Sequence, residues 1–119
     1  MKGEAEKILE WLEDINNTGK VILVEGKKDV NALKRLGVEN VKMLNGPVFS
    51  FVERISKKNK EVIILTDLDK EGRKLYSMMK KGFERNGVKI EDSFRLFLFK
   101  ETKLRQIEGI DTYIENTRS

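Results

Sequence analysis

Short apolar runs alternate with amphipathic segments along most of the chain. From Gly3 to Asn17 the apolar residues fall on one arc at about 100° per residue, with acids opposite, which predicts a helix over residues 3–17. Apolar runs predict strands at Lys20–Val24 and Glu61–Thr66, a weaker strand at Val41–Leu44 and a fourth strand at Phe94–Phe99. The apolar core of the first two does not alternate with polar residues, which is typical of strands covered on both faces, as in a parallel sheet.

Helical patterns fill the intervals between these strands. They cover Lys27–Leu36, about Phe49–Lys57 and about Lys70–Asn86. Strands and helices therefore alternate, and right-handed crossovers between parallel strands place helices on both sides of the sheet. The pattern predicts an α/β fold with a four-stranded parallel sheet and helices on both faces.

The length of the chain and its lack of linkers indicate one domain. It has 119 residues, no internal repeat or linker, and a single proline, Pro47. We divide it into the N-terminal helix (residues 3–17), a core (residues 20–99) and a tail (residues 100–119) with a helix near 111–115. No apolar run approaches the ~18 residues of a membrane span, and Met1–Glu10 lacks the apolar segment of a secretory signal. We expect a cytoplasmic protein with no membrane partner.

Composition removes several kinds of chemistry. The chain has no cysteine and no histidine, so it has no disulfide, no thiolate nucleophile and no zinc site of the usual Cys/His type. Proton transfer would fall to carboxylates, lysines or tyrosines, and a bound metal must be a hard ion held by oxygen. The net charge of +4 is mild; such an excess more often serves solubility, although it leans toward a polyanionic partner.

Acidic residues follow two of the most apolar predicted strands. Glu25 follows Lys20–Val24, while Asp67 and Asp69 follow Glu61–Thr66. Ligand sites of parallel sheets lie at the carboxyl ends of the strands, so the three carboxylates meet at one edge if these strands are neighbours. Asp67 and Asp69 are two residues apart and are expected to face one cation together. A hard divalent ion with water and phosphate oxygens fits such a carboxylate set.

The turns after both strands suit a phosphate ligand. Gly26 and Gly72 allow close approach of the backbone, and helix N-termini behind them carry partial positive charge. Neither turn matches a GxxxxGK[ST] or GxGxxG loop, so ATP and NAD are disfavoured. The candidate phosphate or nucleic-acid contacts are Lys27, Lys28, Arg73 and Lys74. A solvated surface explains these cations equally well.

A purely structural explanation also exists for two of the acids. Asp69 is suited to cap the helix that starts at Lys70, and Asp29 to complement a helix dipole. Glu25 resists this explanation, because glutamate caps poorly and is costly at the end of a buried strand.

The two acidic turns resemble a known motif pair. Val-Glu-Gly-Lys-Lys-Asp at 24–29 and Thr-Asp-Leu-Asp-Lys-Glu-Gly at 66–72 resemble the Toprim domain of topoisomerases, primases, nucleases and recombination mediators. The resemblance covers roughly residues 20–99 and implies a Toprim/Rossmann-like fold. Among these proteins the chain looks most similar to small free-standing forms and to ribonucleases that mature the small ribosomal RNA.

The resemblance also implies roles for individual residues. Glu25 would be the general acid/base and would share the metal site, while Asp67 and Asp69 would coordinate Mg²⁺, with Mn²⁺ as a substitute. Gly26, Asp29 and Gly72 would shape the turns.

The chain departs from two branches of the family. Arg73 stands where type IA topoisomerases usually have a further glutamate, and the length leaves no room for their tyrosine-bearing domain. A chain without cysteine or histidine cannot build the zinc module of primases. We expect neither activity from this chain alone.

Three functions remain open from the sequence. The first is a Mg²⁺-dependent enzyme that cleaves phosphodiester bonds of RNA or DNA. The second is a non-catalytic module that binds nucleic acid or docks a partner, and the third is a subunit active only in a homo-oligomer or with another chain.

Overall fold

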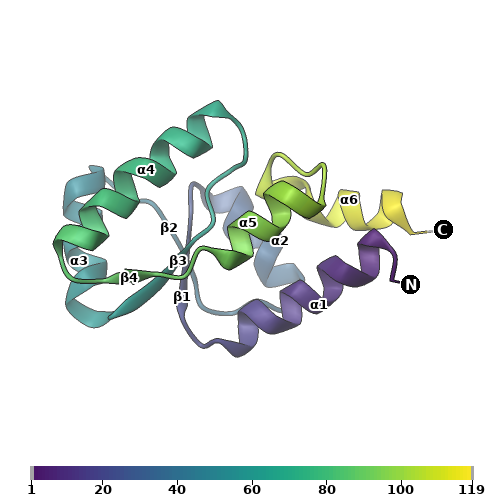
Figure 1. Cartoon of the computed structure of the whole chain (residues 1–119), viewed down its shortest axis with the longest axis horizontal. Coiled ribbons are helices and arrows are strands. Elements are labelled where there is room, and N and C mark those ends of the chain that lie inside the picture. The colour runs from purple at the N-terminus through teal and green to yellow at the C-terminus, as the bar shows by residue number, and fades with distance from the viewer. Residues whose placement is uncertain (1, 119) are drawn as a thin grey trace.

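A parallel sheet of four strands lies at the centre of the protein (Figure 1). The computed structural model describes residues 2–118. The strands are β1 (Val21–Val24), β2 (Val41–Met43), β3 (Glu61–Ile64) and β4 (Lys89–Ile90), in the order β2-β1-β3-β4. All three pairings are parallel, so the predicted α/β fold with a four-stranded parallel sheet is confirmed.

Helices cover both faces of this sheet, as predicted. Within residues 2–118 there are six α-helices and one 3₁₀ helix: α1 (Glu4–Asn17), α2 (Lys27–Arg35), α3 (Val48–Lys58), α4 (Lys70–Arg85), α5 (Ser93–Glu101), η1 (Ile107–Gly109) and α6 (Ile110–Thr117). Helices α1, α2, α5 and α6 share one apolar core with the sheet, while α3 and α4 share the other (Figure 1).

The side chains of β1 show how the sheet separates the two cores. Ile22 and Val24 enter the core under α1 and α2, whereas Val21 and Leu23 enter the core under α3 and α4. All four are at most 2% exposed, and full burial of such a side chain contributes about 1.5–3 kcal/mol. This two-sided burial explains why the strand is an unbroken apolar run.

The fourth strand is not where the sequence pattern placed it. Phe94–Phe99 was predicted as a strand but lies in α5, and the fourth strand is the two-residue β4. Arg95 and Leu98 are buried three positions apart, while Leu96 is 43% exposed, which is the spacing of a helix. Periodicity alone does not distinguish a short apolar run in a strand from one in a buried helix.

The tail beyond the predicted core completes the larger apolar cluster. Leu104, Ile107, Ile110 and Ile114 are buried in it, and α6 packs against α1. The two ends of the chain therefore lie on the same side of the molecule (Figure 1). The helix predicted near 111–115 is α6, which is longer than predicted.

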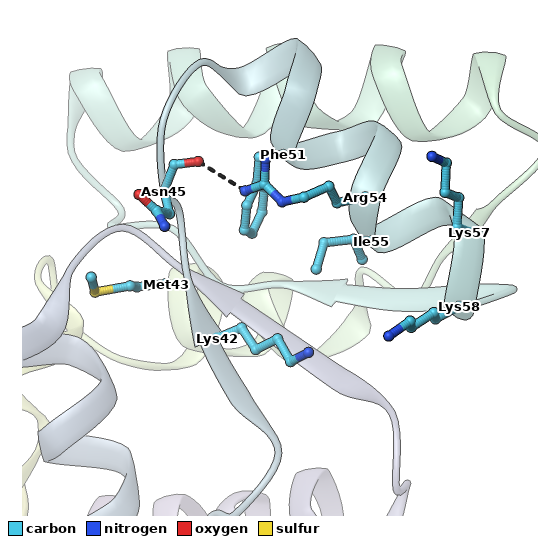
Figure 2. A pocket seen from close by; sticks show the side chains of 8 residues that line it. All are labelled: Lys42, Met43, Asn45, Phe51, Arg54, Ile55, Lys57 and Lys58. Carbon is cyan, nitrogen blue, oxygen red and sulfur yellow. Dashed lines mark hydrogen bonds between the residues drawn. The ribbon is translucent and has the colours of Figure 1, made fainter.

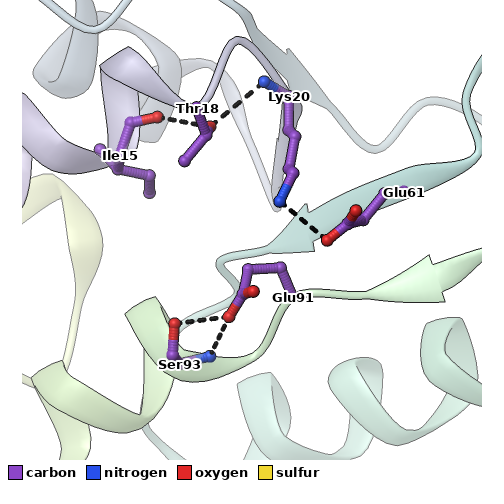
Figure 3. Close-up of polar contacts among 6 residues, drawn as sticks. All are labelled: Ile15, Thr18, Lys20, Glu61, Glu91 and Ser93. Atoms are coloured by element: carbon purple, nitrogen blue, oxygen red, sulfur yellow. Dashed lines mark hydrogen bonds and ion pairs between the residues drawn. The ribbon is translucent and has the colours of Figure 1, made fainter.

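Two acids near the ends of strands have polar partners. Lys20, before β1, bonds Glu61 at the start of β3, with 2.8 Å between Nζ and Oε1 (Figure 3). Glu91, after β4, accepts hydrogen bonds from the backbone N–H and the hydroxyl of Ser93, which lower the pKa of Glu91 (Figure 3). Glu61 and Glu91 are therefore already bonded to neighbouring residues.

The part of the chain that the structure describes contains no helix with both the length and the apolar character needed to cross a membrane.

Candidate functional site

The carboxyl ends of β1 and β3 define the candidate site. These strands are neighbours at the centre of the sheet, and the chain leaves them in opposite directions, to α2 on one face and to α4 on the other. Ligands of open α/β sheets bind at such a switch point, because the two diverging connections leave a crevice. Glu25 follows β1 and Asp67 follows β3, so both acids lie there.

Glu25 and Asp67 are joined by a hydrogen bond at this switch point. The backbone N–H of Asp67 donates a hydrogen bond of 2.7 Å to Glu25 Oε2. Burial raises the pKa of Glu25; the Asp67 N–H works against this, and the negative charge of Asp67 adds to the rise. A carboxyl in this position gains and releases a proton closer to neutral pH than an ordinary glutamate.

None of the acids at this edge is neutralised by a basic side chain. The ion pairs among residues 2–118 join Lys2 to Glu10, Lys20 to Glu61 and Glu115 to Arg118. Glu25, Asp67, Asp69 and Asp29 take part in none of them. Adjacent carboxylates without a cationic partner favour either protonation of one member or a bound cation.

Asp67 is held by a segment that lies far away in the sequence. Its Oδ1 accepts a 2.8 Å hydrogen bond from the backbone N–H of Ile107, at the start of η1. The next residue, Leu68, donates to the carbonyl of Arg105 at 2.7 Å. The tail thus fixes the acidic loop through two hydrogen bonds, which sequence periodicity gives no means of predicting.

Asp69 caps helix α4, as its structural interpretation anticipated. Its Oδ1 accepts the backbone N–H of Gly72 at 2.8 Å. The carbonyl of Gly72 in turn accepts a 2.7 Å hydrogen bond from the buried hydroxyl of Thr66. Gly72 itself is packed against the backbone of Asp67, where a Cβ would lie 2.5 Å from the carbonyl carbon and closer still to the oxygen. Only glycine fits this position, because backbone atoms lie where a methyl group would be.

Asp29 braces the first turn. Its Oδ2 accepts the backbone N–H of Gly26 at 3.1 Å, so the acid ties the turn after β1 to the first turn of α2. Asp29 is only 6% exposed. Burial and the charge of Asp67 raise the pKa of Asp29, while the backbone amide of Gly26 counteracts them.

Arg95 is a site residue that the sequence pattern does not indicate, because the strand predicted over Phe94–Phe99 gives it no contact with the acidic turns. From α5 its Nη2 donates to the carbonyl of Asp67 at 2.7 Å, and its Nε donates to the carbonyl of Thr66 at 3.2 Å. The guanidinium stacks on the ring of Tyr76, 4.7 Å from the centroid. Burial lowers the pKa of Arg95, and the charges of Glu25 and Asp67 counteract this. A positive group therefore lies behind the acidic loop, bonded to its carbonyls and not to its carboxylates.

The predicted phosphate contacts are exposed at the starts of two helices. Lys27 and Lys28 open α2, while Arg73 and Lys74 lie in the first turns of α4. The charge of Arg73 also lowers the pKa of Arg95, so the two cations lie near the same loop. Their contact with phosphate stays a prediction.

The fit of a divalent ion depends on the carboxylate oxygens of Asp67 and Asp69 that are not bonded to the backbone. Among residues 2–118 no three acidic side chains form a ready-made metal site. Asp67 and Asp69 each use one carboxylate oxygen for a backbone N–H and retain the other. Mg²⁺ commonly takes only one or two carboxylates and keeps several waters, so these two acids would be enough to hold it if both face one ion.

Comparison with protein families agrees with this geometry. The Toprim domain model matches residues 20–97, which include both acidic turns, and the protein therefore belongs to the Toprim domain family. Toprim domains in general bind Mg²⁺.

Curated relatives are matched over nearly the whole chain. A UPF0292 protein of Methanocaldococcus jannaschii is 35% identical over 116 residues, covering 92% of this chain and 91% of the relative. A UPF0292 protein of Methanosarcina acetivorans is 37% identical over 118 residues, covering 96% and 82%. These identities place the chain among the small UPF0292 proteins.

A solved structure shares the fold. A protein from Aquifex aeolicus superposes with a TM-score of 0.77 and 34% identity, covering 83% of this chain and 94% of that one.

Proposed function

We propose that this protein cleaves phosphodiester bonds of RNA or DNA with the help of Mg²⁺. The observation that carries the proposal is the contact between Glu25 and Asp67 at the switch point, with the pKa of Glu25 raised and no basic side chain paired to either acid. RNA is included because the motif pair resembles that of ribonucleases that mature the small ribosomal RNA.

Each residue at the candidate site has a separate role in the proposed hydrolysis. Water attacks the phosphorus and releases a proton to the solvent, the bond to the leaving oxygen breaks, and that oxygen takes up a proton. Glu25 is placed to donate this proton, because its raised pKa keeps a larger protonated fraction at neutral pH. Asp67 and Asp69 would hold Mg²⁺, which when bound neutralises charge on the phosphate oxygens. Arg73, exposed nearby, is suited to engage two phosphate oxygens through its guanidinium.

Matched substitutions test this proposal. Glu25→Gln and Asp67→Asn should each lower the cleavage rate of structured RNA or DNA by about 10²-fold or more in Mg²⁺ or Mn²⁺ buffer. Glu13→Gln and Asp14→Asn make the same chemical changes at exposed positions of α1 and should leave the rate unchanged. Equal cleavage by Glu25→Gln and the parent would show that Glu25 moves no proton.

A second candidate, a non-catalytic module, is favoured by one observation. One carboxylate oxygen of Asp67 and one of Asp69 accept a hydrogen bond from a backbone N–H. Asp67 thereby stabilises the loop, and Asp69 the start of α4. Salt-sensitive binding of nucleic acid without turnover at any Mg²⁺ or Mn²⁺ concentration would select this module over the nuclease.

A further inference from the structure

A groove between β2 and α3 is lined by cations and by no acid. Its volume is about 430 Å³. Lys42 lies on β2, and Arg54, Lys57 and Lys58 lie along α3 (Figure 2). The remaining lining residues are Met43, Asn45, Phe51 and Ile55. β2 is an edge strand, so no further strand covers this side of the sheet.

The four positive charges lack counter-ions. All four side chains are exposed, and none belongs to an ion pair among the residues that the structure describes. Glu53 lies on the same helix but does not line the groove. Like charges gathered around one hollow repel each other, and a bound polyanion relieves that repulsion.

Arg54 is already held in one position. Its Nη2 donates to the carbonyl of Asn45 at 3.1 Å, and its guanidinium lies 5.7 Å from the centroid of the Phe51 ring (Figure 2). Phe51 is 3% exposed and gives this contact a rigid base. An ordered guanidinium loses less conformational entropy when it binds phosphate than a free side chain does.

The groove opens at the edge that carries the candidate active site. The backbone N–H of Leu44 donates to the carbonyl of Val24 at 2.8 Å. Asn45, which lines the groove, is the residue after Leu44, and Glu25 is the residue after Val24. A strand that leaves Glu25 along this edge therefore meets Asn45 and Arg54 first and Lys58, at the far end of α3, last.

From this arrangement we infer that the groove between β2 and α3 binds the phosphates of a nucleic-acid strand whose neighbouring segment lies at Glu25 and Asp67. The inference deepens the proposed function by adding a binding track outside the two acidic turns. Recognition is by the sugar-phosphate backbone, so it is independent of base sequence.

Salt-dependent binding tests this directly. A fluorescein-labelled 12-mer, prepared as RNA and as DNA, is titrated with the parent protein between 50 and 200 mM KCl. The variant Lys42→Gln/Arg54→Gln/Lys57→Gln/Lys58→Gln should bind at least about 10-fold more weakly at 50 mM, and its slope of log K against log salt should be shallower by about 3. If only one of the two polymers shows this change, it is the strand that the groove holds.

A control variant removes the same charge elsewhere. Lys7→Gln/Lys34→Gln/Lys89→Gln/Lys100→Gln changes four exposed lysines outside the groove and should retain most of the affinity. Circular dichroism checks that both variants fold. On the parent, photo-cross-linking of a thio-substituted oligonucleotide should label residues 42–58, which gives a readout that needs no substitution.

The outcomes separate this inference from the proposed function. Equal weakening of both quadruple variants, or competition by poly-L-glutamate as strong as that by the 12-mer, would overturn the groove as a nucleic-acid site. If the parent binds the 12-mer but cleaves nothing at any Mg²⁺ or Mn²⁺ concentration, while the groove variant loses binding, the nuclease proposal fails and the groove stands. Loss of cleavage in Asp67→Asn with binding independent of the groove charges gives the reverse result.

Discussion

Alanine in place of Gly72 tests how the acidic loop is held against α4. On helix propensity alone this change should stabilise the protein by about 0.5–1 kcal/mol, because Gly72 lies in the first turn of a helix. The packing predicts the opposite. A Cβ at this position would lie 2.5 Å from the carbonyl carbon and 2.9 Å from the Cα of Asp67, inside the 3.0 Å that real Cβ atoms essentially never cross.

The cost follows from the contacts that must yield. Moving the two backbones apart costs about 1–3 kcal/mol as over-packing. The same movement weakens the Asp69 cap on the Gly72 N–H, worth about 1 kcal/mol. It also weakens the buried bond from the Thr66 hydroxyl to the Gly72 carbonyl, worth about 1 kcal/mol. After subtraction of the propensity gain, we expect Gly72→Ala to lose about 2–4 kcal/mol.

Urea unfolding measures this loss, and Gly82→Ala is its control. Gly82 lies in the same helix, but a Cβ there meets a movable side-chain methyl of Val52 at 3.1 Å. We expect Gly82→Ala to stay within about 1 kcal/mol of the parent, because the propensity gain offsets a small adjustment. If Gly72→Ala matched Gly82→Ala in stability, the close approach of α4 to Asp67 would be refuted, and with it our account of how the acidic loop is positioned.

Three further predictions concern Glu25, Arg95 and helix α5. In metal-free buffer Glu25→Gln should raise the free energy of unfolding at neutral pH, because burial and Asp67 raise the pKa of Glu25 and its ionisation therefore destabilises the fold. That gain should shrink as pH falls through the folded-state pKa, where Glu25 is neutral, and a gain constant with pH would contradict it. Arg95→Met should cost about 2–4 kcal/mol in urea unfolding, since it leaves two carbonyls without their donor, and a loss below 1 kcal/mol would show that Arg95 is dispensable. Leu98→Ala should cost about 2–5 kcal/mol, whereas Leu96→Ala should stay within about 0.5 kcal/mol; similar losses at both positions would favour a strand over α5.

The sequence alone determined the central strands, the alternating helices and the position of Glu25 and Asp67 after β1 and β3. These features depend on local properties: the period of apolar residues and the turn residues that end each run. The cap at Asp69 belongs to the same class, because donor and acceptor are three residues apart. Local patterns therefore located the acids but left their surroundings open.

Tertiary structure alone decided what surrounds those acids. The Phe94–Phe99 run became a helix because packing, and not period, chooses between the two forms of a short apolar segment. As a result Arg95 reaches the Asp67 carbonyl across 28 positions, and the Ile107 N–H reaches the Asp67 carboxylate across 40. Contacts between such distant residues leave no periodic trace in the chain, since they arise only when the elements pack together.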